Sequence, residues 1–338
     1  MPEQMFVPNP LTQVTRGDEA VYHYFPKQIR AVGVGGAGCN IINYLYSLGA
    51  FGAHMIAVDT DDKHLSVIRA DERFLIGRSV AKESGTHGDV AMGRLAAEKS
   101  GWKLDEAFRG TKLMFIAGGM GGGTATGGLP VIARQARDAG ALVVAIVTLP
   151  FADEAEARQK AIAGVGRLLD AANTTVVIDF EQLRDYDRGE PRAEALGAMD
   201  ELIARTLKTT IEAMTQRPLV HVNILDIDRI FRDGGLGTVL IGRDRSDDNL
   251  LNVLDNTLKY PLLGLDYHGA QAAFIHVASG RDMSIEGVKM IVEHLYSRIS
   301  SSINVLYGAR LEHTGDCRVR ITVILTGLKK EAFNEAFS

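Results

Sequence analysis

Two glycine-rich segments carry the residue types that bind phosphate. The first reads GVGGAG, with Gly33, Gly35 and Gly38 between an apolar run and an amphipathic stretch. Glycines let backbone amides approach a phosphate, and the dipole of a following helix favours its negative charge. Asp59 ends the next apolar run, about 20 residues on, where a dinucleotide-binding fold keeps its ribose acid. Alone, this pattern also fits an NAD-dependent dehydrogenase.

The second segment favours a nucleoside triphosphate. It reads GGMGGGTATGG from Gly118 to Gly128, follows an apolar run, and contains Thr124 and Thr126. Its amides form an anion nest, and its hydroxyls suit phosphate or Mg²⁺. A dehydrogenase has no use for a second such loop, whereas two loops at one sheet edge could grip a triphosphate from both sides. The P-loop pattern GxxxxGK[ST] is absent, so binding would rest on amides, helix dipoles and a metal.

These loops need a sheet to hold them. Short apolar, β-branched runs alternate with amphipathic stretches, which is typical of an α/β fold with a parallel, Rossmann-like sheet covered on both faces. We expect the strands at residues 29–34, 53–58, 73–76, 112–117, 141–149 and 174–179. We expect the helices to begin at Asn40, Val90, Thr124 and Glu154.

A long helix should follow this sheet. Apolar residues at helical spacing predict it from Ala193 to Met214. Four further apolar runs and two helical stretches beyond it predict a second, smaller α+β domain. The expected divisions are an N-terminal extension at 1–28, a nucleotide-binding domain at 29–192, a central helix at 193–218 and a C-terminal domain at 219–330.

The composition narrows the classes of function. The 338 residues carry a formal net charge of -5 and show no Lys/Arg cluster, so nucleic acid is not an expected partner. No apolar run approaches the roughly 20 residues of a membrane span, and the start lacks the features of a signal peptide. Two unpaired cysteines, Cys39 and Cys317, fit a reducing cytoplasm. The nine histidines never gather at ligand spacing, so no structural metal site is expected.

The motifs resemble those of the tubulin/FtsZ superfamily, and of its FtsZ branch most closely. The family's signature loop is GGGTGTG, and residues 121–127 read GGGTATG. GVGGAGCN at 33–40, DTD at 59–61 and GTHGD at 85–89 follow the order of the family's other loops. The likeness extends from about Arg30 to Leu325, so it covers most of the chain.

The resemblance implies a GTP/GDP site with Mg²⁺. Asn40 and Asp200 match positions that contact guanine, and Glu154 and Arg158 match positions that hold the ribose and phosphates. The implied nucleotide-binding residues are Gly35, Gly36, Ala37, Gly38, Asn40, Asp59, Asp61, Gly88, Asp89, Gly121, Gly122, Gly123, Thr124, Thr126, Glu154, Arg158, Phe180 and Asp200.

Several positions depart from the family pattern. Phe180 stands where the family commonly has asparagine, and Leu196 where an aromatic residue lies against the base, so we expect Phe180 to supply the aromatic face. Ala125 and His87 each replace a loop glycine.

In this family, the next subunit along a filament completes the nucleotide site with an acidic loop. The corresponding segment is NILDID, in which Asn223, Asp226 and Asp228 are the implied catalytic residues. Leu225 replaces the middle acid of the usual NxDxxD pattern, and Asp226 is shifted by one position, so we expect slow hydrolysis. Because Asp228 follows the long helix, it should lie far from its own subunit's nucleotide and serve a neighbour's. An alternative role for Asp228 is to cap the helix that follows.

The leading interpretation is therefore a cytoplasmic GTPase that polymerises head to tail in cell division or cell shape. A nucleotide-binding filament or regulatory protein with little turnover would share every phosphate loop. An NAD dehydrogenase rests on GxGxxG and Asp59 alone. Family members that build a division ring usually end in a flexible linker and an adaptor-binding peptide, and this sequence shows neither. We therefore expect either that the sequence is truncated or that division or membrane-adaptor proteins bind another surface.

Overall fold

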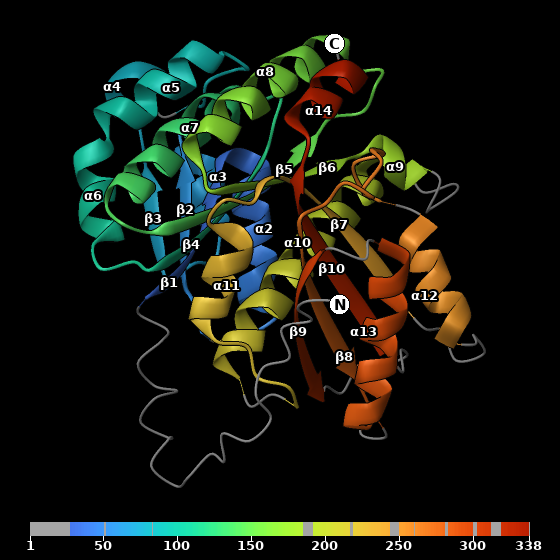
Figure 1. Ribbon diagram of the computed structural model, residues 1–338. Helices are drawn as coiled ribbons and strands as arrows, with labels where there is room; N and C mark the ends of the chain where they lie inside the picture. The colour runs from blue at the N-terminus through green and yellow to red at the C-terminus, as the bar shows by residue number, and fades with distance from the viewer. Residues whose placement is uncertain are drawn as a thin grey trace, which may run out of the picture.

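The structure, a computed structural model, is built on one ten-stranded sheet with strand order β3-β2-β1-β4-β5-β6-β7-β10-β8-β9 (Figure 1). It describes residues 28–50, 52–82, 84–184, 192–216, 219–243, 250–259, 261–280, 283–299, 303–311 and 319–337. The strands are β1 (Ile29–Val34), β2 (His54–Asp59), β3 (Glu72–Leu75), β4 (Leu113–Gly119), β5 (Leu142–Leu149), β6 (Thr174–Asp179), β7 (Gly235–Arg243), β8 (Ala272–Ser279), β9 (Asn304–Leu311) and β10 (Val319–Leu328).

Helices cover both faces of this sheet. The helices of the first half are α2 (Gly35–Ser47), α3 (Asp62–Val67), α4 (Arg78–Ala81), α5 (Val90–Lys99), α6 (Gly101–Phe108), α7 (Gly123–Asp138), α8 (Ala155–Ala171) and α9 (Glu181–Arg184). The remaining helices are α10 (Arg192–Thr215), α11 (Ile224–Phe231), α12 (Leu250–Lys259), α13 (Ile285–Ile299) and α14 (Lys330–Phe337). None of these helices is long and apolar enough to cross a membrane.

The first six strands are all parallel. Their apolar side chains are buried on both faces, as expected for a sheet that is covered by helices on each side. Because the strands are parallel, the turns β1–α2, β2–α3 and β4–α7 leave the same edge, which we call the carboxyl edge. Both glycine-rich segments therefore lie at one edge of the sheet, as predicted.

The second half continues the same sheet. Strand β7 pairs in parallel with β6 through only Thr174–Gly235, Thr175–Leu236 and Val176–Gly237. Strand β10 then lies antiparallel between β7 and β8, and β9 pairs in parallel with β8. The strands expected in a second domain are therefore an extension of the first sheet.

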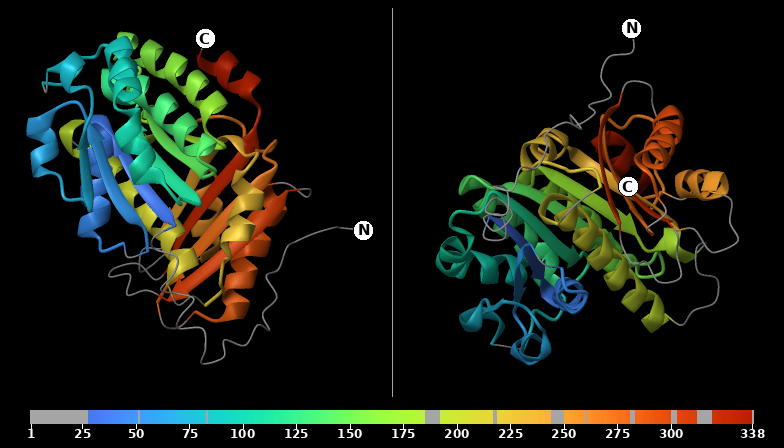
Figure 2. Two further views of the ribbon diagram at one scale, coloured as in Figure 1. Left: turned by 90° about the vertical axis from the view of Figure 1, so that its left-hand side faces the viewer. Right: turned by 90° about the horizontal axis from the view of Figure 1, so that it is seen from below.

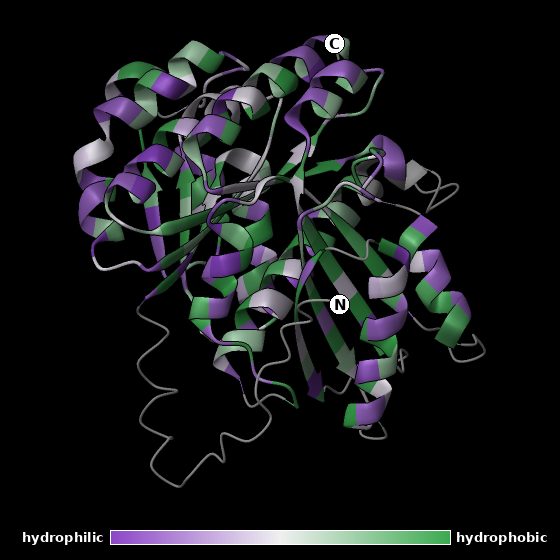
Figure 3. Ribbon diagram, in the orientation of Figure 1, coloured by the Kyte–Doolittle hydropathy of each residue, from purple (hydrophilic) through white to green (hydrophobic). Residues whose placement is uncertain are grey.

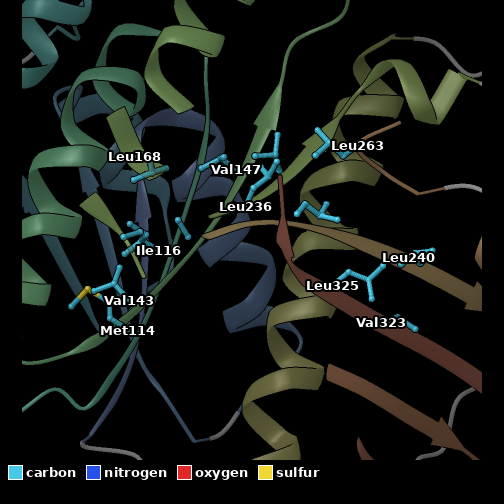
Figure 4. Close-up of a cluster of buried hydrophobic side chains, with 14 of the residues drawn as sticks. Met114, Ile116, Val143, Val147, Leu168, Leu236, Leu240, Leu263, Val323 and Leu325 are labelled. Carbon is cyan, nitrogen blue, oxygen red and sulfur yellow. The ribbon is translucent and has the colours of Figure 1, made fainter. Parts of the chain in front are cut away.

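Two large apolar cores lie on opposite faces of the sheet. One packs α5–α8 and α12–α14 against side chains from both halves, including Ile116, Val147, Leu236 and Val323 (Figure 4). The other packs α2, α10 and α11 against the opposite face. Hydrophobic residues gather on the strands and inner helix faces, with hydrophilic residues on the outer faces (Figure 3).

The long helix predicted at 193–214 is α10. Its buried Met199, Ile203, Leu207 and Ile211 repeat at helical spacing and face the second core. It packs on α2 and reaches β8 and β9, so it bridges the two halves of the sheet (Figures 1 and 2).

Candidate functional site

The β1–α2 turn presents open backbone at the carboxyl edge. Helix α2 begins at Gly35, not at Asn40 as expected, because the glycines themselves form its first turn. A Cβ at Gly38 would lie 2.5 Å from the Ala117 carbonyl oxygen, so this glycine allows α2 to pack against β4. A Cβ at Gly36 would meet nothing within 4 Å, so the backbone there is open to a ligand.

The β4–α7 turn presents a second open segment. Gly121 has a φ of 112°, a conformation that favours glycine, and its amide donates to the Thr126 hydroxyl over 2.8 Å. Gly122 is exposed, and a Cβ there would meet nothing within 4 Å. Gly123 begins α7, so the helix dipole acts beside this opening.

Three loops meet at the Thr124 hydroxyl. It lies 2.7 Å from the Thr60 hydroxyl after β2 and 3.2 Å from the Thr86 hydroxyl before α5. All three threonines are buried, so these bonds fix the loops to each other. A Cβ at Gly123 would lie 2.4 Å from the Asp89 carbonyl oxygen, which shows how closely the loop before α5 packs on α7.

Two predicted ligand acids cap helices. The Asp61 carboxylate accepts from the backbone amides of Lys63 and His64 at the start of α3. The Asp89 carboxylate accepts from the Met92 amide at the start of α5 over 3.0 Å. Gly88, beside Asp89, is approached by the Lys160 ammonium, which lies 3.4 Å from its carbonyl oxygen. Both acids are therefore held at this edge by capping bonds.

A polar chain runs from Asp59 to Asp200. The Asp59 carboxylate lies 3.0 Å from Nδ1 of His64, and Nε2 of His64 lies 3.1 Å from Oδ1 of Asn40. Asn40 in turn hydrogen-bonds the Asp200 carboxylate. The structure thus brings Asn40, Asp59 and Asp200 together, and their roles toward a nucleotide stay predictions. His64 was missed because it belongs to no motif, and only its position five residues after Asp59 could have indicated it.

Burial changes the acidity of two groups here. Burial raises the pKa of Asp200 to about 7, although the Asn40 hydrogen bond opposes this shift. Burial and the Asp59 carboxylate raise the pKa of the Cys39 thiol, with the Val58 backbone bond acting in the opposite direction. Asp200 therefore changes charge near neutral pH.

Glu154 and Arg158 lie at the start of α8. Glu154 precedes the helix, and its carboxylate accepts from the Phe151 amide over 3.2 Å. The Arg158 guanidinium makes a bidentate ion pair with Asp179, at 2.9 and 2.7 Å, and both side chains are largely buried. Phe180 is buried, with its ring 5.2 Å from that of Phe151. Arg158 and Phe180 thus have protein partners, and their roles toward a nucleotide stay predictions.

The acidic segment forms α11, and its cap is Asn223. The Asn223 side chain accepts from the Leu225 amide over 2.9 Å, so Asp228 is not an N-cap but lies within the helix. Asp226 lies 3.6 Å from the Arg229 guanidinium, and Asp228 pairs with Arg232.

The end of α11 is fixed at the amino-terminal edge of the sheet. The Thr174 hydroxyl, at the start of β6, donates to the Phe231 carbonyl over 2.6 Å. The Asn173 side-chain amide donates to the Arg232 carbonyl over 3.0 Å. Strand β6 runs from this edge to the carboxyl edge and its six residues span about 20 Å. Asp228, one turn before Arg232, is therefore remote from both glycine-rich turns of its own chain.

Two family models match the chain. Residues 28–187 match the Tubulin/FtsZ family, GTPase domain, and residues 235–329 match the FtsZ family, C-terminal domain. Cell division protein FtsZ 2 of Halobacterium salinarum is 35% identical over 302 residues, which cover 89% of this chain and 77% of that protein. Cell division protein FtsZ 2 of Methanocaldococcus jannaschii is 37% identical over 305 residues, covering 89% and 80%.

Solved structures share the fold. An FtsZ dimer from M. jannaschii superposes with a TM-score of 0.87 at 32% identity, covering 94% of this chain and 93% of that chain. CetZ2 from Haloferax volcanii, solved as a GTPγS-bound protofilament, gives a TM-score of 0.76 at 23% identity, covering 92% and 96%. The second likeness is one of fold alone.

Proposed function

The chain belongs to the tubulin/FtsZ family, and on that basis we propose that it binds and hydrolyses GTP and assembles head to tail into filaments. The observation that carries this proposal is the pair of open backbone segments at Gly36 and Gly122 on one sheet edge. Backbone amides on both sides, each beside a helix start, suit the phosphates of one nucleotide. Membership of a GTPase family also argues against an NAD-dependent dehydrogenase, which only GxGxxG and Asp59 favoured.

Asn40 and Asp200 would recognise guanine. An ionised carboxylate accepts the two N–H bonds that the guanine ring edge offers, and the Asn40 amide is oriented by His64 and Asp200. Residues 29–192 would form the GTP-binding domain, and residues 219–330 the C-terminal domain that takes part in assembly.

Mg²⁺ fits this site because the surrounding side chains offer oxygen atoms. Asp61 directly follows Thr60, and the Asp89 backbone amide donates to the Thr86 carbonyl, so both acids lie close to the three bonded threonines. Mg²⁺ in nucleotide sites is held by one or two carboxylates together with phosphates. It would neutralise charge on the phosphate oxygens. The chain's own amides at Gly122 and Gly123 and the α7 dipole would stabilise the same charge.

Hydrolysis would be completed by a neighbour. Asp228 and Asn223 belong to the amino-terminal edge, too far from their own glycine-rich turns to reach a nucleotide there. A head-to-tail contact would bring this edge against the carboxyl edge of the next subunit. There the Asp228 carboxylate would orient the attacking water, whereas Asp226, two residues earlier on α11, faces another side of the helix.

A filament with little turnover is the second candidate function. Leu225 is 67% exposed where the family has an acid, and both remaining acids have cationic partners in Arg229 and Arg232.

Since the relatives are named cell division proteins, we propose a role in division or cell shape, with adaptor proteins as further partners.

Identifying the nucleotide that co-purifies with the protein tests the proposal. We expect GDP or GTP. Adenine nucleotide alone, or no binding by folded protein at millimolar GTP, would contradict it.

Asp228→Ala should retain GTP binding and lose most phosphate release, whereas Asp233→Ala, which removes an exposed acid nearby, should release phosphate normally. Equal turnover in both variants would favour another hydrolytic group.

A further inference from the structure

The His64 ring lies between two hydrogen-bond acceptors. Its Nδ1 is 3.0 Å from the Asp59 carboxylate, and its Nε2 is 3.1 Å from the Asn40 side-chain oxygen. A neutral imidazole has one N–H and one lone pair, so it satisfies only one of these acceptors. A metal cation bound at Nδ1 would leave Nε2–H to donate to the Asn40 oxygen, so that both ring nitrogens would have a partner.

A third potential ligand, the Cys39 thiol, lies near the Asp59 carboxylate and the His64 ring. The ligand atoms of Cys39, Asp59 and His64 all lie within 4.8 Å of one another. The Cys39 thiol donates weak hydrogen bonds to the Val58 carbonyl at 3.6 Å and the Gly33 carbonyl at 3.9 Å. One Asp59 oxygen accepts from the Thr60 amide, and the other faces His64.

These distances are close to those of a tetrahedral zinc site. Zinc bonds of about 2.0–2.3 Å place ligand atoms about 3.3–3.8 Å apart, so side-chain shifts of about 1 Å would close the cluster around an ion. His64 is partly exposed, which provides an entry path, whereas Cys39 and Asp59 are buried. Metal binding would displace the thiol proton.

We propose that Cys39, Asp59 and His64 form a binding site for a thiophilic divalent cation such as Zn²⁺. Sulfur, imidazole and carboxylate ligands select such an ion over Mg²⁺. With Nδ1 on the metal, Nε2–H would donate to Asn40, the kind of bond that orients metal-ligating histidines. The site goes beyond the proposed function, and its existence does not depend on GTP binding.

Sequence spacing does not reveal this cluster. Cys39 lies on α2, Asp59 ends β2 and His64 lies on α3. The parallel pairing of β1 with β2 places the starts of α2 and α3 side by side at the carboxyl edge. The chain therefore assembles the ligands in space without a metal-binding motif.

Cadmium tests the proposal, because its bond to a thiolate gives an ultraviolet charge-transfer band. We expect the full-length protein to bind one Cd²⁺ with this band and to release it to excess Zn²⁺. Cys39→Ser should abolish the band, and Cys317→Ser, the matched control, should retain it. His64→Ala should weaken Cd²⁺ binding by about 10-fold or more.

His54→Ala controls for a general effect of histidine loss. His54 also lies between carboxylates, at 2.7 Å from Glu72 and 3.7 Å from Asp71, but His54 is not part of the cysteine cluster. The His54→Ala variant should leave the charge-transfer band unchanged. The proposal is overturned if the wild-type protein gives no band, if the band survives Cys39→Ser, or if His64→Ala binds Cd²⁺ as tightly as His54→Ala. Since His64→Ala leaves the buried Cys39 in place, it decides the matter even if Cys39→Ser fails to fold.

Discussion

At the scale of single residues, Gly122 separates ligand binding from folding. A side chain there would enter open space, and its backbone φ of -77° suits any residue. Gly122→Val should therefore change the free energy of unfolding by no more than about 0.5 kcal/mol. It should weaken GTP binding on the order of 100-fold or more, because the Cβ would occupy the space of a phosphate.

Gly166→Val is the matched control. Gly166 also has nothing within 4 Å of an added Cβ, but it lies in the middle of α8. Calorimetric titration with GTP should give wild-type affinity for this variant. Equal affinities for both variants would show that phosphate does not approach Gly122.

Asp200 gives a stability effect that depends on pH. Its folded-state pKa of about 7 lies above its ordinary value of 3.8, so the stability present at low pH is lost as pH rises through 7. Asp200→Asn should therefore stabilise the nucleotide-free protein at pH 8, by at most about 4 kcal/mol. At about pH 5 the gain should be less than half as large. The same variant should lose GTP binding, because an amide cannot accept both guanine N–H bonds.

Urea unfolding of the nucleotide-free protein at the two pH values measures the difference. A gain in stability that is equal at both would contradict the shifted pKa. Unchanged GTP affinity in Asp200→Asn would remove Asp200 from base recognition.

At the scale of elements, the Arg158–Asp179 pair joins α8 to the end of β6. Removing the arginine would leave a buried, unpaired carboxylate, which costs about 3–5 kcal/mol. Arg158→Ala should therefore destabilise the nucleotide-free protein by that amount. Arg205→Ala, which breaks the more exposed pair with Glu201 on α10, should cost less than about 1 kcal/mol.

Chemical denaturation with and without GTP separates two roles of Arg158. If Arg158→Ala keeps wild-type stability without nucleotide but loses GTP affinity, the arginine serves the phosphates, as the family resemblance implies.

The sequence predicted where the strands lie better than it predicted the short helices or which strands pair with each other. Continuous apolar runs located β1, β4 and β5 within one or two residues, because buried parallel strands admit few polar side chains. The short helices α3 and α6 were missed, since tertiary contacts outweigh weak local preference in such segments. The pairing of β6 with β7 rests on three residue pairs whose members lie far apart in the sequence. No local pattern encodes such pairs.

The candidate site was predictable only in part. Glycine spacing and the GGGTATG loop predicted the open backbone at Gly122, because phosphate binding needs glycines in that pattern. The capping of α11 by Asn223 and the contacts of His64 both depend on the residue at which a helix begins. Local sequence leaves that residue uncertain by several positions.

At the scale of the whole molecule, the separation of Asp228 from the glycine-rich turns should make GTP hydrolysis depend on assembly. Asp228 and the glycine-rich turns lie at opposite edges of one subunit. Phosphate release per molecule should therefore rise from a low plateau above a threshold protein concentration that coincides with the onset of light scattering. Asp228→Ala should scatter light with little release at any concentration. Constant release per wild-type molecule on dilution would mean that each subunit hydrolyses its own nucleotide.

The position of β10 between β7 and β8 has a consequence during synthesis. Strands β1 to β6 are complete once residue 179 has been made, but β7 and β8 each lack a neighbour until residues 319–328 emerge. At about 5–20 residues per second, the ribosome needs several seconds to pass from β7 to β10. Throughout that interval two apolar strand edges can pair with other nascent chains. Crowded polysomes are thus where this fold is most exposed to misassembly, and slower translation after β8 would prolong the exposure.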